Sequence, residues 1–232
     1  MTTTVPLLLA SASPRRRQLL SLLDVPYTVC VSPVDEEAAQ ARYQGSIEGL
    51  AQWLAEQKAS AVLPGRDQSG PYAGGHVVIT ADTTVLLNGE VLGKPRDKAH
   101  ARELLLSLRN RWHRVVTGVA VGRMIDGRPV IRSASCMTPV LMRPYSEEEV
   151  AGYIATGDPL DKAGAYGIQH PEFQPTARID GCYLNVVGLP LCVLIQLLAE
   201  FDVHPLAEGR KARGWAGCPW SEQCKVRFEL WI

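Results

Sequence analysis

The sequence has no excess of charge of either sign and no long hydrophobic run. Its 232 residues include 24 lysines and arginines and 24 aspartates and glutamates, so the formal net charge is zero at pH 7. This balance argues against a general nucleic-acid coat, and any anion-binding site must therefore be local. No apolar stretch reaches 18 residues, so the sequence predicts no membrane-spanning helix.

Three common catalytic motifs are also missing. The chain has no GxxxxGK[ST] phosphate loop, no GxGxxG dinucleotide fingerprint and no GxSxG nucleophile elbow. Hydride transfer and acyl transfer lose support accordingly. The five histidines are scattered, and none stands at the spacing of a metal-binding pair.

Cysteines are few and spread over a chain that is large enough to build its own core. A disulfide framework is not expected in that setting. We interpret the first four as small core residues, whereas Cys218 and Cys224 lack the second ligand pair that a zinc site needs. The six are Cys30, Cys136, Cys182, Cys192, Cys218 and Cys224.

The N-terminal apolar segment from Val5 to Ala10 could be mistaken for a short signal-peptide core. No lysine or arginine precedes it, and arginines follow it, which is the wrong order for a signal peptide. We interpret the segment as a buried first strand and expect a cytoplasmic protein.

Strand-like and helix-like segments alternate along the chain, which predicts an α/β fold with some mixed strand pairing. The expected strands are Val5 to Ala10, Tyr27 to Val31, Val77 to Leu87, Val91 to Leu92, Val115 to Val121 and Val130 to Leu141. The expected helices are Pro14 to Leu23, Ser46 to Val62, one capped by Asp97, Ser146 to Gly157, and Pro190 to about Phe201. Asn88-Gly89 and Asp126-Gly127 are typical hairpin turns, and 64–75 is expected to be a surface loop.

Three arginines stand where a helix N-terminus is expected. Ser13 is a suitable N-cap and Pro14 a suitable first helical residue, and Arg15–Arg17 follow directly. Because this end of a helix carries partial positive charge, arginines there indicate an anion that is shared with backbone amides and the hydroxyls of Ser11 and Ser13. We favour phosphate contact for Arg15, whereas the next two arginines could equally point to solvent.

Two charged residues interrupt apolar patterns. Asp82 lies inside a strand-like run, where aspartate is rare and a buried carboxylate needs a partner. We favour a metal ligand or general base over a carboxylate that is satisfied by backbone N–H groups. Lys58 follows Leu54 on the apolar face of its helix, where it could reach the surface or point into a cleft toward phosphate.

Two further segments carry groups suited to ligand binding. The run Asp35-Glu36-Glu37 follows a strand and could supply a metal-binding carboxylate, or it could be a solvated charged loop. The segment from Leu160 to Gln169 is compact and rich in glycine, which favours close approach of its backbone to a ligand.

Five motifs together resemble the Maf-like nucleoside triphosphate pyrophosphatases, in the order of that family and over roughly Leu7 to Phe201. The motifs are Ala10-Ser11-Ala12-Ser13-Pro14-Arg15-Arg16, Ala81-Asp82-Thr83, Gly93-Lys94-Pro95-Arg96-Asp97, Asp161-Lys162-Ala163-Gly164-Ala165-Tyr166-Gly167-Ile168-Gln169 and Asn185-Val186-Val187-Gly188-Leu189-Pro190. The resemblance implies an elongated α/β fold, two-lobed, with a mixed sheet, flanking helices and a cleft between the lobes. It also implies hydrolysis of nucleoside triphosphates to the monophosphate and pyrophosphate with a divalent metal, Mg²⁺ or Mn²⁺, and often a homodimer.

The resemblance also implies roles for individual residues. Asp82 would be the catalytic carboxylate that orients metal and water for attack on the α-phosphorus, and Glu36 would help to bind the metal. The residues implied in substrate binding are Ser11, Ser13, Arg15, Lys58, Thr83, Lys94, Asp161, Lys162 and Gln169, of which Arg15, Thr83 and Gln169 match positions associated with base selection.

The motif that ends at Gln169 resembles the family branch that acts on dTTP, UTP and modified pyrimidine nucleotides. After Gln169, however, His170 to Pro175 replaces the usual glycine-rich segment, so specificity of the 7-methyl-GTP type stays open. A non-catalytic nucleotide sensor linked to cell division and a nucleic-acid-binding protein are the alternatives. We expect a catalytic domain over 1–207, a basic, tryptophan-rich tail of unknown role over 208–232, and no membrane or nucleic-acid partner.

Overall fold

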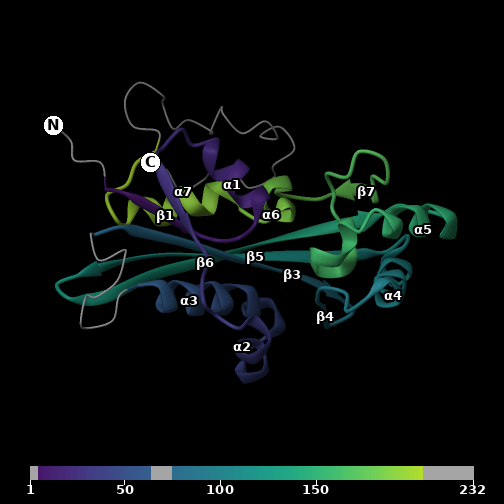
Figure 1. The fold of residues 1–232 in the computed structure, drawn as a ribbon, viewed down its shortest axis with the longest axis horizontal. Helices are drawn as coiled ribbons and strands as arrows, with labels where there is room; N and C mark the ends of the chain where they lie inside the picture. The colour runs from purple at the N-terminus through teal and green to yellow at the C-terminus, as the bar shows by residue number, and fades with distance from the viewer. Residues whose placement is uncertain (1–4, 64–74, 206–232) are drawn as a thin grey trace.

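The structure is a computed structural model, and it describes residues 5–63 and 75–205. The molecule is elongated along its sheet (Figure 1). Nearly all of the loop expected at 64–75, the tail from 208, and Cys218 and Cys224 lie outside the described residues.

Within the described segments, seven strands form one mixed sheet. They are β1 (Leu7–Ala10), β2 (Tyr27–Cys30), β3 (Val77–Leu87), β4 (Glu90–Leu92), β5 (Trp112–Ile125), β6 (Arg128–Met142) and β7 (Thr176–Ile179). The order is β2-β1-β3-β5-β6-β7, with β4 paired to β3. β1 is parallel to β2 and β3, and the other pairs are antiparallel, which confirms the mixed pairing. β7 was not predicted from the sequence.

Helices cover both faces of the sheet. The α-helices are α1 (Pro14–Ser21), α2 (Glu36–Arg42), α3 (Leu50–Val62), α4 (Lys98–Leu108), α5 (Glu147–Ala155), α6 (Tyr183–Val187) and α7 (Leu191–Ala199), and short 3-10 turns are η1 (Ile47–Gly49), η2 (Asp158–Asp161) and η3 (Ala163–Ala165). α1, α6 and α7 lie on one face, α3 lies on the opposite face, and α4 and α5 lie at one end (Figure 1). In this part of the chain, no helix has the length and apolar character needed to cross a membrane.

The predicted helix starts are confirmed by their caps. The Ser13 hydroxyl accepts a hydrogen bond from the backbone N–H of Arg16, and Pro14 is the first residue of α1. Asp97 caps α4 in the same way, and Ser146 and Glu149 form a reciprocal capping box at α5. These local signals depend on neighbours three residues apart, so the sequence alone shows them.

Two boundaries differ from the prediction. α1 ends at Ser21 rather than Leu23, because the chain turns at Asp24, whose φ is +52°, to enter β2. The predicted helix from Ser46 begins as the 3-10 turn η1 and becomes α3 only at Leu50. A third difference concerns the acidic run that begins at Asp35. This run starts the helix α2 and is not a loop, because the Asp35 carboxylate caps the helix by accepting a hydrogen bond from the N–H of Ala38.

Two hydrophobic clusters occupy the two ends of the molecule, and β3 passes from one to the other. Ile79 belongs to the cluster beneath α1, α6 and α7, whereas Val85 belongs to the cluster around α4 and α5. Between these positions stand Asp82, Thr83 and Thr84. The strand therefore carries its polar residues across the boundary between two cores, as expected for a two-lobed fold.

The four cysteines in the described residues all pack in or against hydrophobic clusters. Cys182 and Cys192 are buried in the cluster beneath α1, α6 and α7, and Cys136 packs against that cluster. Cys30 is half-buried and packs against a smaller cluster around Leu8. The interpretation as core residues is confirmed for Cys182 and Cys192, whereas Cys30 and Cys136 are half-buried.

Candidate active site

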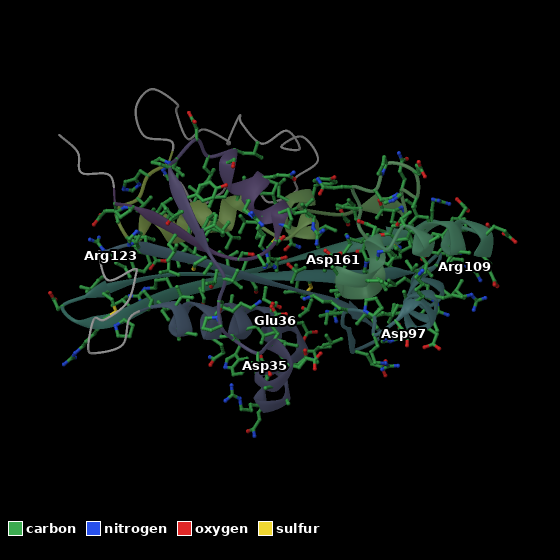
Figure 2. The ribbon with its side chains drawn as sticks, viewed as in Figure 1. Asp35, Glu36, Asp97, Arg109, Arg123 and Asp161 are labelled. Atoms are coloured by element: carbon green, nitrogen blue, oxygen red, sulfur yellow. The ribbon has the colours of Figure 1, made fainter. Side chains whose placement is uncertain are left out.

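A cavity of about 830 Å³ lies between the two lobes. Its walls include Ala81 from one hydrophobic cluster and Val85 and Tyr166 from the other. Every site residue predicted from the sequence lines it, namely Ser11, Ser13, Arg15, Glu36, Lys58, Asp82, Thr83, Lys94, Asp161, Lys162 and Gln169. In Figure 2, the labelled Glu36 and Asp161 lie near the middle of the long axis, far from Arg123 and Arg109 at its two ends.

Lys58 contacts two carboxylates that also line the cavity. Its Nζ lies 2.6 Å from Asp82 Oδ1 and 2.7 Å from Glu36 Oε1. Lys58 is 6% exposed and Asp82 is 7% exposed, so the contact between Lys58 and Asp82 is largely shielded from water. The lysine on the apolar face of α3 thus points into the cavity, and the alternative that it reaches the surface is wrong.

The backbone brings α3 close enough for this contact. Gly118 on β5 pairs with Asp82 on β3, and a Cβ atom added at Gly118 would lie 2.3 Å from the backbone of Gln52 on α3. Only glycine permits the helix to lie this near to the sheet. The close packing of α3 places Lys58 within reach of Asp82.

Glu36 is held in its charged form by neighbouring cations. Burial works to raise the pKa of Glu36, but the positive charges of Lys58, Lys94 and Arg16 outweigh it and hold the pKa below its usual value. The Nζ of Lys94 lies 3.6 Å from Glu36 Oε2. Glu36 therefore presents a carboxylate to the cavity at neutral pH.

The arginine most firmly held at the start of α1 is Arg16. Its Nε donates to Gly188 O at 2.9 Å, and its Nη2 donates to Thr83 Oγ1 at 3.1 Å. Arg15 is half-buried and also lines the cavity, whereas Arg17 is exposed and donates to the carbonyl of Ala12. Solvent exposure is thus wrong for Arg16 and confirmed for Arg17.

Helical spacing could have identified Arg16. It precedes Leu19 and Leu20 by three and four residues, which places it on the same face of α1 as these buried leucines. Burial lowers the pKa of Arg16, while the negative charges of Asp82 and Glu36 oppose that shift. The guanidinium thus lies in the field of the two carboxylates that Lys58 joins.

A buried network fixes the partners of Arg16. Thr83 Oγ1 lies 2.9 Å from Thr117 Oγ1, and Thr117 in turn bonds through its hydroxyl and its backbone N–H to Asn185, which is fully buried. Gly188 adopts φ +120°, and a Cβ there would lie 3.4 Å from Thr83 Oγ1. The Asn185 to Pro190 motif therefore shapes the site through Arg16.

The glycine-rich segment before Gln169 is built around Lys162. Its Nζ lies 2.8 Å from Asp158 Oδ1 and 2.6 Å from Asp161 Oδ1, and the residue is 8% exposed. Gly167 leaves room for it, because a Cβ there would lie 2.9 Å from Lys162 Cε. Lys162 and its two carboxylates hold the wall in shape, and the exposed Gln169 lies at the cavity's edge.

The segment after Gln169 is anchored in the hydrophobic cluster of this lobe. Phe173 is buried, with ring centroids 5.1 Å from Tyr145 and 4.3 Å from Tyr153. Arg143 binds the Phe173 carbonyl at 2.6 Å. The unusual segment is thus a packed part of the lobe.

The two carboxylates are suitable ligands for a divalent cation. Glu36 and Asp82 both reach one ammonium group, so their oxygens face a common point, and carboxylate oxygens are the ligands that Mg²⁺ prefers. Across the described residues, no group of three or more histidine, cysteine, aspartate or glutamate side chains is placed to hold a metal. A metal here would complete its coordination with water and substrate phosphates, which is usual for Mg²⁺.

An α/β cavity that combines paired carboxylates with Arg15, Arg16 and Lys94 is that of a protein that handles phosphorylated ligands. The family model described as "Maf-like protein" matches residues 6–201. The chain belongs to this Maf-like family.

Curated relatives resemble the chain over nearly its whole length. A dTTP/UTP pyrophosphatase of Dehalococcoides mccartyi is 41% identical over 215 residues, covering 92% of this chain and 89% of the relative. Proteins of the same name from Yersinia pestis and Symbiobacterium thermophilum are 45% and 44% identical, covering 84% and 88% of this chain and 92% and 97% of the relatives.

Proposed function

We propose that this chain is a nucleoside triphosphate pyrophosphatase that converts dTTP, UTP and modified pyrimidine nucleotides to the monophosphate and pyrophosphate. The observation that carries the proposal is the contact of Lys58 with both Asp82 and Glu36 inside a cavity that Arg15, Arg16 and Lys94 also line. The curated relatives named dTTP/UTP pyrophosphatase support the substrate class.

In this proposal, Asp82 acts on the attacking water. As a carboxylate, it accepts a hydrogen bond from water and takes its proton as oxygen attacks the α-phosphorus. Asp82 and Glu36 would hold Mg²⁺ or Mn²⁺, which when bound would supply positive charge at the reacting phosphate. Arg15, Arg16 and Lys94 would bind the pyrophosphate that leaves and stabilise its growing negative charge.

Lys58 is suited to link the carboxylates to the substrate. An ammonium group has three N–H donors, and Asp82 and Glu36 accept two of them. The third is available to a phosphate oxygen. Lys58 therefore fixes the positions of both carboxylates and offers positive charge to the phosphate.

The proposal is tested by assaying pyrophosphate release from dTTP, UTP, CTP and 7-methyl-GTP, with Mg²⁺ or Mn²⁺ and again with a chelator. We expect release from dTTP and UTP that depends on the metal. A preference for 7-methyl-GTP would keep the enzyme class and change the substrate. Nucleotide binding without any hydrolysis would favour the sensor.

The Asp82→Asn variant separates catalysis from binding. We expect its turnover to fall at least about 100-fold, because the proton acceptor is lost, while nucleotide affinity is largely kept. Turnover at the level of the unchanged protein would refute the role of Asp82. The homodimer, the domain boundary at 207, cytoplasmic location and the absence of a nucleic-acid partner stay predictions.

A further inference from the structure

His170 lies in the cavity wall directly after Gln169, at the point where the sequence departs from the usual family pattern. It is half-buried and lines the same cavity as Asp82 and Lys58. Its ring contacts the Tyr153 ring edge-on, with centroids 4.8 Å apart. The ring is therefore held in one place by packing.

A hydrogen bond determines which ring nitrogen carries the proton. The backbone N–H of Phe173 donates to His170 Nδ1 at 3.0 Å. A backbone N–H can only donate, so Nδ1 must be the acceptor, and the proton of the neutral ring must sit on Nε2. Among the described residues, His170 Nε2 has no hydrogen-bond partner. The side chain thus keeps one unused N–H donor.

We propose that His170 is a specificity-determining residue whose Nε2–H donates a hydrogen bond to an oxygen acceptor on the nucleoside part of the substrate. The proposal rests on the proposed function. Under that function the cations and Asp82 bind the phosphates, which leaves other residues that line the cavity, among them Gln169 and His170, for the nucleoside. A donor with a fixed direction selects a carbonyl or hydroxyl oxygen and disfavours an amino group, because an unpaired donor is costly.

The surroundings of His170 keep this donor in position. Tyr153 donates from its hydroxyl to Asp158 Oδ2 at 2.6 Å and accepts from the N–H of Gly167 at 2.9 Å. Burial works to raise the pKa of Asp158, but hydrogen bonds from Lys162 and Tyr153 and the positive charge of Lys162 hold it below its usual value. Hydrogen bonds therefore connect Tyr153, Asp158 and Gly167 around the His170 ring.

Two substitutions separate the donor from the local structure. In His170→Asn, the side-chain oxygen can still accept from the N–H of Phe173, but no group reaches the position of Nε2. In His170→Gln, the amide can reach the position of Nε2, but the bond to Phe173 is lost. We expect His170→Asn to raise KM for dTTP and UTP about three- to tenfold, the effect of losing one hydrogen bond. We expect His170→Gln to stay within about twofold of the original KM and to have a lower Tm.

Inhibition by inorganic pyrophosphate reports on the phosphate end alone, and we expect it to be unchanged in both variants. A loss that is equal for dTTP and UTP places the acceptor on the base or on sugar atoms that both share, and a loss confined to UTP places it at the 2′-hydroxyl. Either pattern supports the proposal. An unchanged KM in His170→Asn, an equal loss in both variants, or a matching loss of pyrophosphate inhibition overturns it. Failure of the unsubstituted protein to release pyrophosphate would instead refute the proposed function.

Discussion

The ammonium of Lys58 lies 2.6 Å from the carboxylate of Asp82, and both side chains are buried. This contact ties α3 to β3 at the boundary between the two lobes, and Glu36 completes it from α2. Under the proposed function, stability and catalysis would depend on the same three side chains, so we expect a substitution here to affect both.

Replacing Lys58 with methionine removes the cation and leaves two neighbouring carboxylates without it. We expect the free energy of unfolding at pH 7 to fall by about 3 kcal/mol, because removing one partner of a buried ion pair leaves an uncompensated charge. Urea denaturation measures this loss. Lys98→Met, at an exposed position on α4, is the control and should change stability by less than about 0.5 kcal/mol. A similar loss in both variants would contradict the structural role of Lys58.

Arg16 and Arg17 are neighbours of equal charge with different surroundings. We expect Arg16→Ala to raise KM for dTTP about 10- to 100-fold, as expected for loss of hydrogen bonds to a charged group. Arg17→Ala removes the same charge from an exposed position, so its KM should stay within about twofold. Steady-state kinetics on the two variants show whether the position of the arginine or only its charge determines KM. Equal increases in KM would show that only the net charge matters.

Much of the fold was predictable because its signals are local. The caps at Ser13 and Asp97 and the capping box at Ser146 depend on residues three apart, and each marks a helix that the structure contains. α2 was missed although Glu36 and Glu37 in its first turn are favourable at a helix N-terminus. The four-residue strand β7 gives too short a pattern to distinguish it from a loop.

The sequence predicted residues that line one cavity, but it did not predict their contacts. Gly188 is 172 positions from Arg16, and Thr83 is 67 positions away, so no spacing rule relates them. The same holds for Asn185, whose role in the network that supports Thr83 follows only from the fold. The sequence indicated which charged side chains interrupt apolar patterns, and the structure shows which of these side chains contact one another.

His113 should make the protein less stable in mild acid. Burial lowers its pKa to about 4 in the folded protein, where its Nε2 lies 2.6 Å from the hydroxyl of Tyr166. The unfolded chain takes up a proton near pH 6.5, whereas the folded chain does so only near pH 4, so stability is lost as the pH falls between these values. The expected loss is about 3 kcal/mol by pH 4.

The measurement is the free energy of unfolding of the unchanged protein and of His113→Phe at several pH values between 7.5 and 4. The variant keeps an aromatic ring but cannot take up the proton, so its stability should decline less over this range. Parallel curves for the two proteins would show that the burial of His113 does not cause the acid sensitivity.

Glu36→Gln tests the metal-binding assignment. The amide keeps the size of the side chain and loses the negative charge, so we expect the Mn²⁺ concentration for half-maximal activity to rise at least about tenfold. Glu103→Gln, at an exposed position on α4, is the control and should leave the metal requirement unchanged. An unaltered requirement in Glu36→Gln would remove Glu36 from the metal site.

The most direct test of the account is to identify the bond that is broken and the oxygen that enters. Hydrolysis of dTTP or UTP in ¹⁸O-labelled water with Mg²⁺ or Mn²⁺, followed by ³¹P NMR, reports both. The account predicts pyrophosphate without label and a nucleoside monophosphate that carries one ¹⁸O atom, because water activated by Asp82 would attack the α-phosphorus. Label in the pyrophosphate, or release of a nucleoside diphosphate with labelled orthophosphate, would contradict it.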